Sequence, residues 1–252
     1  MSPVDTRSDD SDPAGVEQAA IEQGTVAEWF DATYRSRGFD YLRPLESYPI
    51  FLQLLDAKAG SELLDVACGP GLLLKAAELR GVRGSGVDIS AAAVEMAGEL
   101  VPNARVLESN AEELPFEDDS FDFITCIGAV ERFLDRERVL GEMRRVARPT
   151  ARFCFMVRNA HTLDWILWKQ WLGMRNVEGH QDAASLDAWS AFFEANGFAI
   201  EGVYIDQWLR QRLRKALRGF RPRDLTRPEP VARPILPLRF ANEFVFIMRH
   251  AT

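Results

Sequence analysis

The chain has 252 residues, of which 47% are apolar, and it carries a formal net charge of −8. This length and apolar content suit one domain with a well-buried core. The acidic charge argues against a nucleic-acid partner, which would need a broad basic surface, and the apolar runs are shorter than the roughly 20 residues of a membrane-spanning helix.

The N-terminal part of the chain divides into two segments. Residues 1–24 are acidic and polar and lack an apolar core, so we expect a disordered leader and not a signal peptide. Residues 25–58 are helical in pattern, with interruptions at Pro44 and Pro49 because proline breaks a helix interior.

Predicted strands and helices then alternate up to residue 157. Ser90 is a typical N-cap, and Pro149 ends the last helix of this series. Such alternation predicts a mostly parallel sheet with helices on both faces. The predicted strands are 62–67, 84–88, 104–108, 121–127 and 152–157, and the predicted helices are 71–80, 90–100 and 131–147.

The pattern changes beyond residue 157. A Trp-rich helical segment covers 161–179, and a helix at 185–196 ends before Gly197. Two more strands are predicted at 198–205 and 240–248, which makes seven in all. Between these strands, Trp208 to Arg239 contains ten Lys or Arg against two acidic residues, a local charge of 10 − 2 = +8.

The turn after the first strand, Asp65-Val66-Ala67-Cys68-Gly69-Pro70-Gly71, is typical of a nucleotide site. Gly69 and Gly71 lack side chains, so a ligand can approach the backbone at the carboxyl edge of the sheet. Asp88 ends the next strand, 88 − 65 = 23 residues later, where a carboxylate accepts hydrogen bonds from ribose hydroxyls. Leu74 stands where a dinucleotide fingerprint needs a third glycine, which disfavours NAD.

Several segments between Leu63 and Val157 resemble, in order and spacing, the class I S-adenosylmethionine-dependent methyltransferases, in particular their small-molecule, ubiquinone-biosynthesis-like group. The matching segments are 64–71, 86–90, 110–116, 120–129 and 145–149, with Ala67 where many members have glycine. The resemblance implies a Rossmann-like fold, that is, a doubly wound, seven-stranded, mostly parallel α/β sheet with helices on both faces and an antiparallel last strand. It also implies a single domain over 25–252, in which 25–58, 160–184 and 207–239 form the substrate cap.

The resemblance further implies a set of S-adenosylmethionine contacts. Residues 65–71 would hold the methionine moiety, Asp88 the ribose, and Asn110 with Ala111 the adenine. The chain departs from the family at Asn110, usually Asp, and at Arg132, often His. Because a cation facing the sulfonium would repel it, we expect Arg132 to point outward or toward an anionic substrate. The complete predicted set is Asp65, Ala67, Cys68, Gly69, Gly71, Asp88, Ile89, Asn110, Ala111, Glu112 and Ile127.

The cysteines and histidines limit which further chemistry the chain can carry out. The three cysteines are odd in number and lack metal-ligand spacing, so we expect no disulfide, no metal site and a cytoplasmic location. His180 is the candidate general base or substrate contact, and a helix-capping or surface histidine is the alternative. Trp165, Trp168 and Trp171 share one helix face, either as core packing or as a lid over the substrate.

Residues 208–221 have the pattern of a basic amphipathic helix, which either contacts an anionic membrane or acidic partner or simply packs by its apolar stripe.

We predict methyl transfer to a small molecule, with oxygen as the favoured acceptor atom and direct in-line transfer. The alternatives are a peripheral-membrane methyltransferase of a quinone-like acceptor and a non-catalytic S-adenosylmethionine-binding protein. A nucleic-acid methyltransferase is disfavoured, because Ile127-Gly128-Ala129-Val130 lacks the Asn-Pro-Pro-Tyr-like motif. The acceptor and the oligomeric state stay open.

Overall fold

The computed structural model describes the backbone of residues 13–162, 183–206, 238 and 241–251, and the side chains of this set from residue 24 onward. Its strands are β1 (Glu62–Val66), β2 (Arg83–Asp88), β3 (Arg105–Glu108), β4 (Phe121–Ile127), β5 (Ala147–Arg158), β6 (Phe198–Ile205) and β7 (Glu243–His250). Its α-helices are α1 (Pro13–Arg37), α2 (Pro49–Leu54), α3 (Leu72–Glu78), α4 (Ala91–Leu100), α5 (Arg136–Val146) and α6 (Leu186–Ala195). Short 3-10 helices cover Gly38–Tyr41, Leu45–Ser47 and Val130–Arg132.

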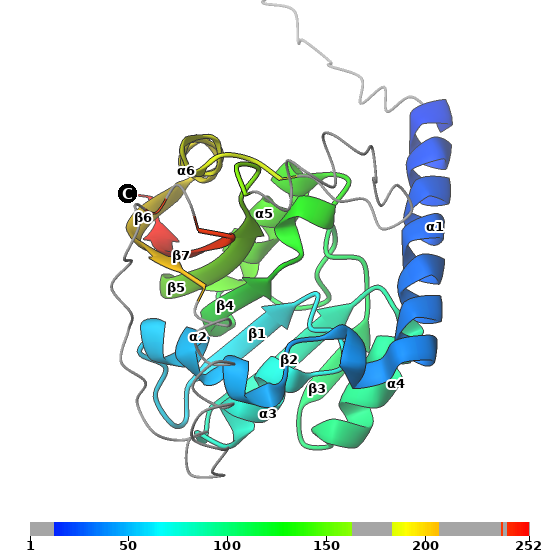
Figure 1. The fold of residues 1–252 in the computed structure, drawn as a ribbon, viewed down its shortest axis with the longest axis horizontal. Helices are drawn as coiled ribbons and strands as arrows, with labels where there is room; N and C mark the ends of the chain where they lie inside the picture. The colour runs from blue at the N-terminus through cyan, green and yellow to red at the C-terminus, as the bar shows by residue number, and fades with distance from the viewer. Residues whose placement is uncertain (1–12, 163–182, 207–237, 239–240, 252) are drawn as a thin grey trace, which may run out of the picture.

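The strands form one sheet in the order β3-β2-β1-β4-β5-β7-β6. The first five are parallel to their neighbours, whereas β7 runs antiparallel to both β5 and β6. The prediction of a doubly wound sheet with an antiparallel last strand is confirmed. Because parallel strands end at the same edge, β1, β2 and β4 bring their C-terminal residues together (Figure 1).

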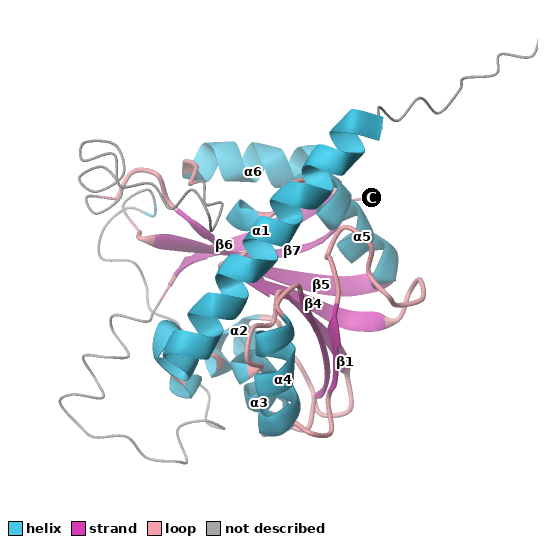
Figure 2. Cartoon of the chain, turned by 90° about the vertical axis from the view of Figure 1, so that its right-hand side faces the viewer, coloured by secondary structure: helices cyan, strands magenta, loops and turns pink. Residues whose placement is uncertain are grey.

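Helices cover both faces of the sheet (Figures 1 and 2). On one face, buried residues of α2 and α3 such as Phe51 and Leu73 pack against β1. On the other, Met143 of α5 and Phe193 of α6 pack with Phe155 of β5. The two apolar layers make the sheet a rigid platform, since strands buried on both faces have little freedom to shift.

Helix α1 lies apart from these layers, along the edge where β1 and β2 end (Figure 2). Its Phe30 and Tyr34 pack against Ala92 and Ala93 of α4. The Asp31 carboxylate accepts hydrogen bonds from the Ser90 hydroxyl and, at 3.0 Å, from the Ala92 backbone N–H. Acidic side chains are stabilised at a helix N-terminus, so Asp31 fixes α1 over the start of α4.

The largest differences between the predicted and observed elements lie at three places. The leader expected to be disordered through Gly24 is helical from Pro13, as its good helix formers such as Ala19 and Ala20 allow. The helix expected at 131–147 begins only at Arg136, because Asp135 caps it by accepting from the Arg138 N–H at 2.9 Å. Strand β5 starts at Ala147, five residues early, since Ala147 already pairs with Phe121 of β4.

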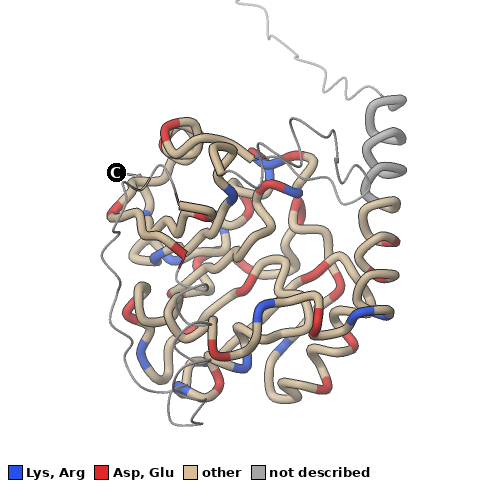
Figure 3. Tube along the Cα trace, viewed as in Figure 1, with Lys and Arg blue, Asp and Glu red and all other residues tan. Residues whose placement is uncertain are grey.

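None of the helices in the described part of the chain is long and apolar enough to cross a membrane. Acidic and basic residues are interspersed along the same part of the chain (Figure 3). The strongly basic segment 208–221 and the three tryptophans of 165–171 lie outside the described residues. Their roles therefore stay predictions.

Candidate active-site cavity

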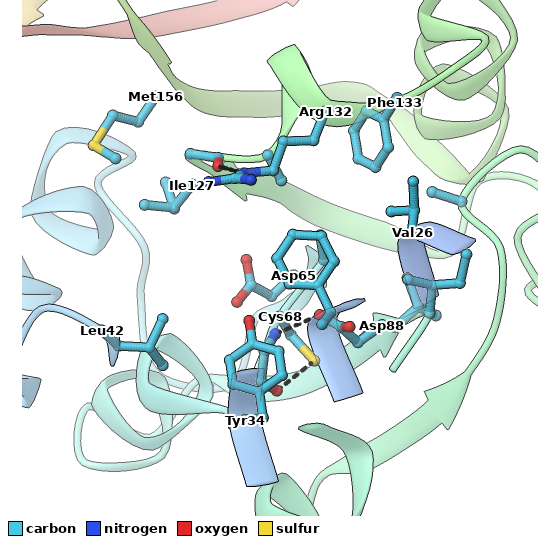
Figure 4. Close-up of a pocket in the computed structure, with 18 of the residues that line it drawn as sticks. Val26, Tyr34, Leu42, Asp65, Cys68, Asp88, Ile127, Arg132, Phe133 and Met156 are labelled. Carbon is cyan, nitrogen blue, oxygen red and sulfur yellow. Dashed lines mark hydrogen bonds between the residues drawn. The ribbon is translucent and has the colours of Figure 1, made fainter. Parts of the chain in front are cut away.

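A cavity of about 460 Å³ lies at the carboxyl edge of the sheet, beneath α1 (Figure 4). One end, which we call the β2 end, is lined by residues at or after the ends of β2 and β3, including Asp88 and Asn110. The other, the β5 end, is lined by residues at or near the ends of β4, β5 and β7. This set comprises Ile127, Arg132, Met156, Arg158 and Glu243.

Ten of the eleven predicted cofactor contacts line this one cavity. The exception is Gly71, which lies just before α3 in the left-handed conformation, with φ of +79°. A Cβ atom at Gly71 would lie 3.1 Å from the Cβ atom of Ala97, so this glycine allows the loop to pack on α4. The ten that line the cavity are Asp65, Ala67, Cys68, Gly69, Asp88, Ile89, Asn110, Ala111, Glu112 and Ile127.

The loop between β1 and α3 exposes its backbone to the cavity because it turns sharply. Ala67 has φ of +57° and Gly69 has φ of +52°, which is costly for a residue with a side chain and explains why glycine is favoured at position 67. A Cβ atom at Gly69 would lie 3.1 Å from the Tyr34 hydroxyl. Tyr34 of α1 can therefore pack this closely on the loop only while residue 69 has no side chain.

Asp88 connects this loop to the end of β2. Its carboxylate accepts from the Gly69 N–H at 2.7 Å (Figure 4) and from the Ser90 N–H at 3.0 Å. Burial raises the pKa of Asp88 to about 6, although the two N–H donors oppose this rise. A carboxylate offers about four acceptor sites, so Asp88 can hold the loop and still accept from a ligand.

Asp65 lies deeper, at the end of β1. It is 3% exposed and accepts from the Thr125 hydroxyl at 2.6 Å. Burial raises its pKa to about 7, a rise that the hydrogen bond from Thr125 opposes. The cavity therefore contains two carboxylates whose ionisation depends on what binds beside them.

Asn110 lies in the loop after β3. Its side-chain oxygen accepts from the Glu112 N–H at 3.1 Å, and the Glu112 carbonyl accepts from Arg138 Nε at 3.0 Å. The loop is thus held to α5, with Ala111 and Glu112 facing the cavity. An amide oxygen has two lone pairs, so Asn110 can also accept from a ligand.

Helix α1 closes the cavity with Val26, Phe30 and Tyr34. The Phe30 and Tyr34 rings stack with centroids 6.0 Å apart. Tyr34 is 6% exposed, and burial raises the pKa of its hydroxyl well above the usual value. From the sequence, aromatic residues in this segment are more often simple packing than a cover, yet the structure places Phe30 and Tyr34 against the cavity.

Arg43 is a wall residue that the sequence analysis missed. It binds Asp206 at 2.9 Å and Glu243 at 2.8 Å, with side-chain exposures of 12%, 9% and 18% for the three residues. These partners are 163 and 200 residues away in the chain. Local sequence carries no signal for such a contact, because only the fold brings the three residues together.

The histidines contribute little to the described part of the cavity. The candidate base His180 lies outside the described residues. His161 is exposed, and the His250 ring contacts the Arg148 carbonyl at 3.1 Å; neither lines the cavity. No group of three or more His, Cys, Asp or Glu in this part of the chain is placed to hold a metal ion, and the three cysteines, all buried, are free thiols.

Comparisons with known proteins agree with this geometry. Residues 64–155 match a family model described as a methyltransferase domain. The chain is 29% identical over 180 residues to YcgJ of Bacillus subtilis, an uncharacterized methyltransferase, covering 66% of this chain and 71% of YcgJ. It is 31% identical over 137 residues to a ubiquinone biosynthesis O-methyltransferase of Pseudomonas putida, covering 50% of this chain and 58% of that enzyme.

A solved structure also shares the fold. The chain superposes on a Haloferax volcanii protein, solved in complex with the Trm112 methyltransferase activator, with a TM-score of 0.65. The alignment covers 90% of this chain and 98% of the other at 19% identity. A similarity at this level shows a common fold and nothing about partners or substrates.

Proposed function

Because the chain carries a class I S-adenosylmethionine-dependent methyltransferase domain of the small-molecule type, we propose that it methylates an oxygen atom of a small hydroxylated aromatic acceptor. The observation that carries the proposal is the single cavity that joins the carboxylates at its β2 end to an apolar surface at its β5 end. The name of the ubiquinone biosynthesis O-methyltransferase relative supports an oxygen atom as the acceptor.

The residues of the β2 end fit S-adenosylmethionine. The cofactor's ribose hydroxyls can donate to Asp88, which already accepts from the loop. The turn at Ala67–Gly69 lines the cavity, and it would hold the methionine moiety with Asp65. The adenine would lie against Asn110, Ala111 and Glu112.

When bound, S-adenosylmethionine supplies an electrophilic methyl group on a sulfonium, which calls for direct in-line attack by an aligned nucleophile. The residues of this chain have to orient the acceptor and exclude water. Phe30 and Tyr34 close the cavity from α1, and Ile127 and Met156 give the β5 end an apolar surface. His180 stays our candidate for the base that removes the acceptor's hydroxyl proton.

The test is an assay of S-adenosylhomocysteine release with a panel of phenols, catechols and quinols. We expect turnover with at least one acceptor, and a product whose new methyl group is bonded to oxygen by mass spectrometry and NMR. Methylation of carbon or nitrogen alone would contradict the proposal. Binding of S-adenosylmethionine without turnover of any acceptor would favour the non-catalytic alternative.

The two buried carboxylates predict a pH dependence of cofactor binding. Accepting hydrogen bonds from ribose requires ionised Asp88, whose pKa is raised to about 6, and Asp65 titrates at about 7. Protonation therefore opposes binding, and the affinity for S-adenosylhomocysteine should fall about tenfold or more from pH about 7.5 to about 5. Calorimetry across this range measures the change; a constant affinity would show that neither carboxylate takes part. The Asp88→Asn variant should bind S-adenosylhomocysteine more weakly, and its affinity should change less with pH.

A further inference from the structure

The geometry points to a carboxylate-binding subsite at the β5 end of the cavity, formed by Arg132 and Arg158, so that the acceptor is a hydroxylated aromatic carboxylate. This inference rests on the proposed function, because it assigns the acceptor of the same site. It begins from the placement of two guanidinium groups on one wall of the cavity. Guanidinium is the side chain best suited to carboxylates, since its planar N–H groups match both oxygens.

Arg132 faces the cavity and not the solvent. It is half-buried, its Nε donates to the Gly128 carbonyl at 3.3 Å, and its guanidinium lies over the Phe30 ring at 5.3 Å from the centroid. Figure 4 shows the side chain reaching over Asp65, on the far side of the cavity from Tyr34. Of the two orientations expected from the sequence, outward or toward an anionic substrate, the first is therefore excluded.

Arg158 lines the same wall from the end of β5. Its Nε lies 3.7 Å from the carboxylate of Glu131, a side chain with no exposed surface. Neither Glu131 oxygen has a hydrogen bond in the described structure, and burial raises the pKa of Glu131 to about 7, a rise that the charges of Arg132 and Arg158 oppose. This ion pair restrains the Arg158 guanidinium at the cavity wall.

The apolar residues of the β5 end suit the ring of an aromatic acid. Ile127 of β4 pairs directly with Met156 of β5, and both line the cavity, as Phe133 does. An apolar surface in the same cavity end as two arginines favours a flat ring that carries a carboxylate. A neutral quinol would leave both guanidinium groups without an anion from the acceptor.

The distribution of charge favours the same ligand. Asp65 and Asp88 lie toward the β2 end, whereas Arg132 and Arg158 lie toward the β5 end. The third arginine of the wall, Arg43, binds Asp206 and Glu243, as Arg158 binds Glu131. An anionic acceptor placed beside Arg132 and Arg158 would gain a favourable charge interaction with both guanidinium groups and with the sulfonium.

The test compares 3,4-dihydroxybenzoate with its neutral amide, 3,4-dihydroxybenzamide, by calorimetry on the full chain saturated with S-adenosylhomocysteine. We expect the carboxylate to bind about tenfold more tightly than the amide. Arg132→Gln and Arg158→Gln should each reduce this preference severalfold, whereas Arg132→Lys should keep part of it. The matched control is Arg105→Gln, because Arg105 also lies over a phenylalanine ring, 5.0 Å from the Phe116 centroid, but outside the cavity.

Three results would overturn the inference: no binding of the carboxylate up to about 10 mM, equal affinity for acid and amide, or a preference that survives both glutamine variants. The affinity for S-adenosylhomocysteine distinguishes a failure of the subsite from a failure of the proposed function. If the wild-type chain does not bind S-adenosylhomocysteine, the proposed function fails and the inference with it. If it binds and the arginine variants change nothing, only the subsite is wrong.

Discussion

Replacing Asp88 with alanine is expected to weaken the binding of S-adenosylhomocysteine about a hundredfold or more. A hydrogen bond to an ionised group contributes about 1.5–3 kcal/mol, and a ribose offers two hydroxyl donors, so the loss is about 3 kcal/mol or more. The variant also removes the acceptor of the Gly69 N–H, which now bonds Asp88 at 2.7 Å. Calorimetry on the purified variant gives the dissociation constant directly.

Asp88→Asn is the matched control, because it keeps the shape and one acceptor oxygen while removing the charge. We expect its affinity to lie between those of the wild type and the alanine variant. Circular dichroism and thermal unfolding would show whether the variants are still folded, and so whether weaker binding reflects the lost contact or a disrupted loop. If Asp88→Ala is folded and binds as tightly as the wild type, the assignment of the β2 end to the ribose is wrong.

Replacing Arg43 with alanine is expected to lower the free energy of unfolding by about 3–5 kcal/mol, the usual cost of removing one partner of a buried ion pair. Arg43 contacts both Asp206 and Glu243, and none of the three side chains is more than 18% exposed. Without the guanidinium, the two carboxylates repel each other across the junction of β6 and β7. Urea unfolding followed by fluorescence measures the difference.

The control for this prediction is an exposed ion pair of the same type. Arg83 binds Glu62 with side-chain exposures of 63% and 31%, so Arg83→Ala should change the unfolding free energy by less than about 1 kcal/mol. Equal losses of unfolding free energy in the two variants would mean that burial does not strengthen the ion pairs of Arg43 with Asp206 and Glu243. A loss at Arg43 without a loss at Arg83 would confirm that the cluster fixes the segment before α2 to the end of the sheet.

The local elements of this fold follow closely from the sequence. Strand β4 at Phe121–Ile127 and strand β6 at Phe198–Ile205 have the predicted bounds. The predicted cap of α4 is also present, since the Ser90 hydroxyl accepts from the Ala93 N–H at 3.2 Å. Strand composition and helix capping depend on neighbouring residues in the chain, so one sequence is enough to predict them.

The ends of helices and strands are harder to predict from the sequence where two local signals compete. The helical pattern from Glu131 onward continues across Asp135, yet the 3-10 helix ends at Arg132 and Asp135 caps a new helix, α5. Strand β5 likewise extends to Ala147 because β4 lies beside it and supplies hydrogen-bonding partners. Pairing across a sheet is a tertiary interaction, and the residues of one strand do not reveal how far it continues.

The sequence by itself determined the β2 end of the cavity, because Asp65, Gly69 and Asp88 lie at strand ends and turns whose spacing is local. Parallel strands that end at one edge bring such residues together in any chain of this pattern. Only the tertiary structure decided that Arg132 faces inward, that Tyr34 covers the loop and that Arg43 meets Asp206 and Glu243. These contacts join residues distant in the chain, and their geometry depends on how whole elements pack, which no local pattern encodes.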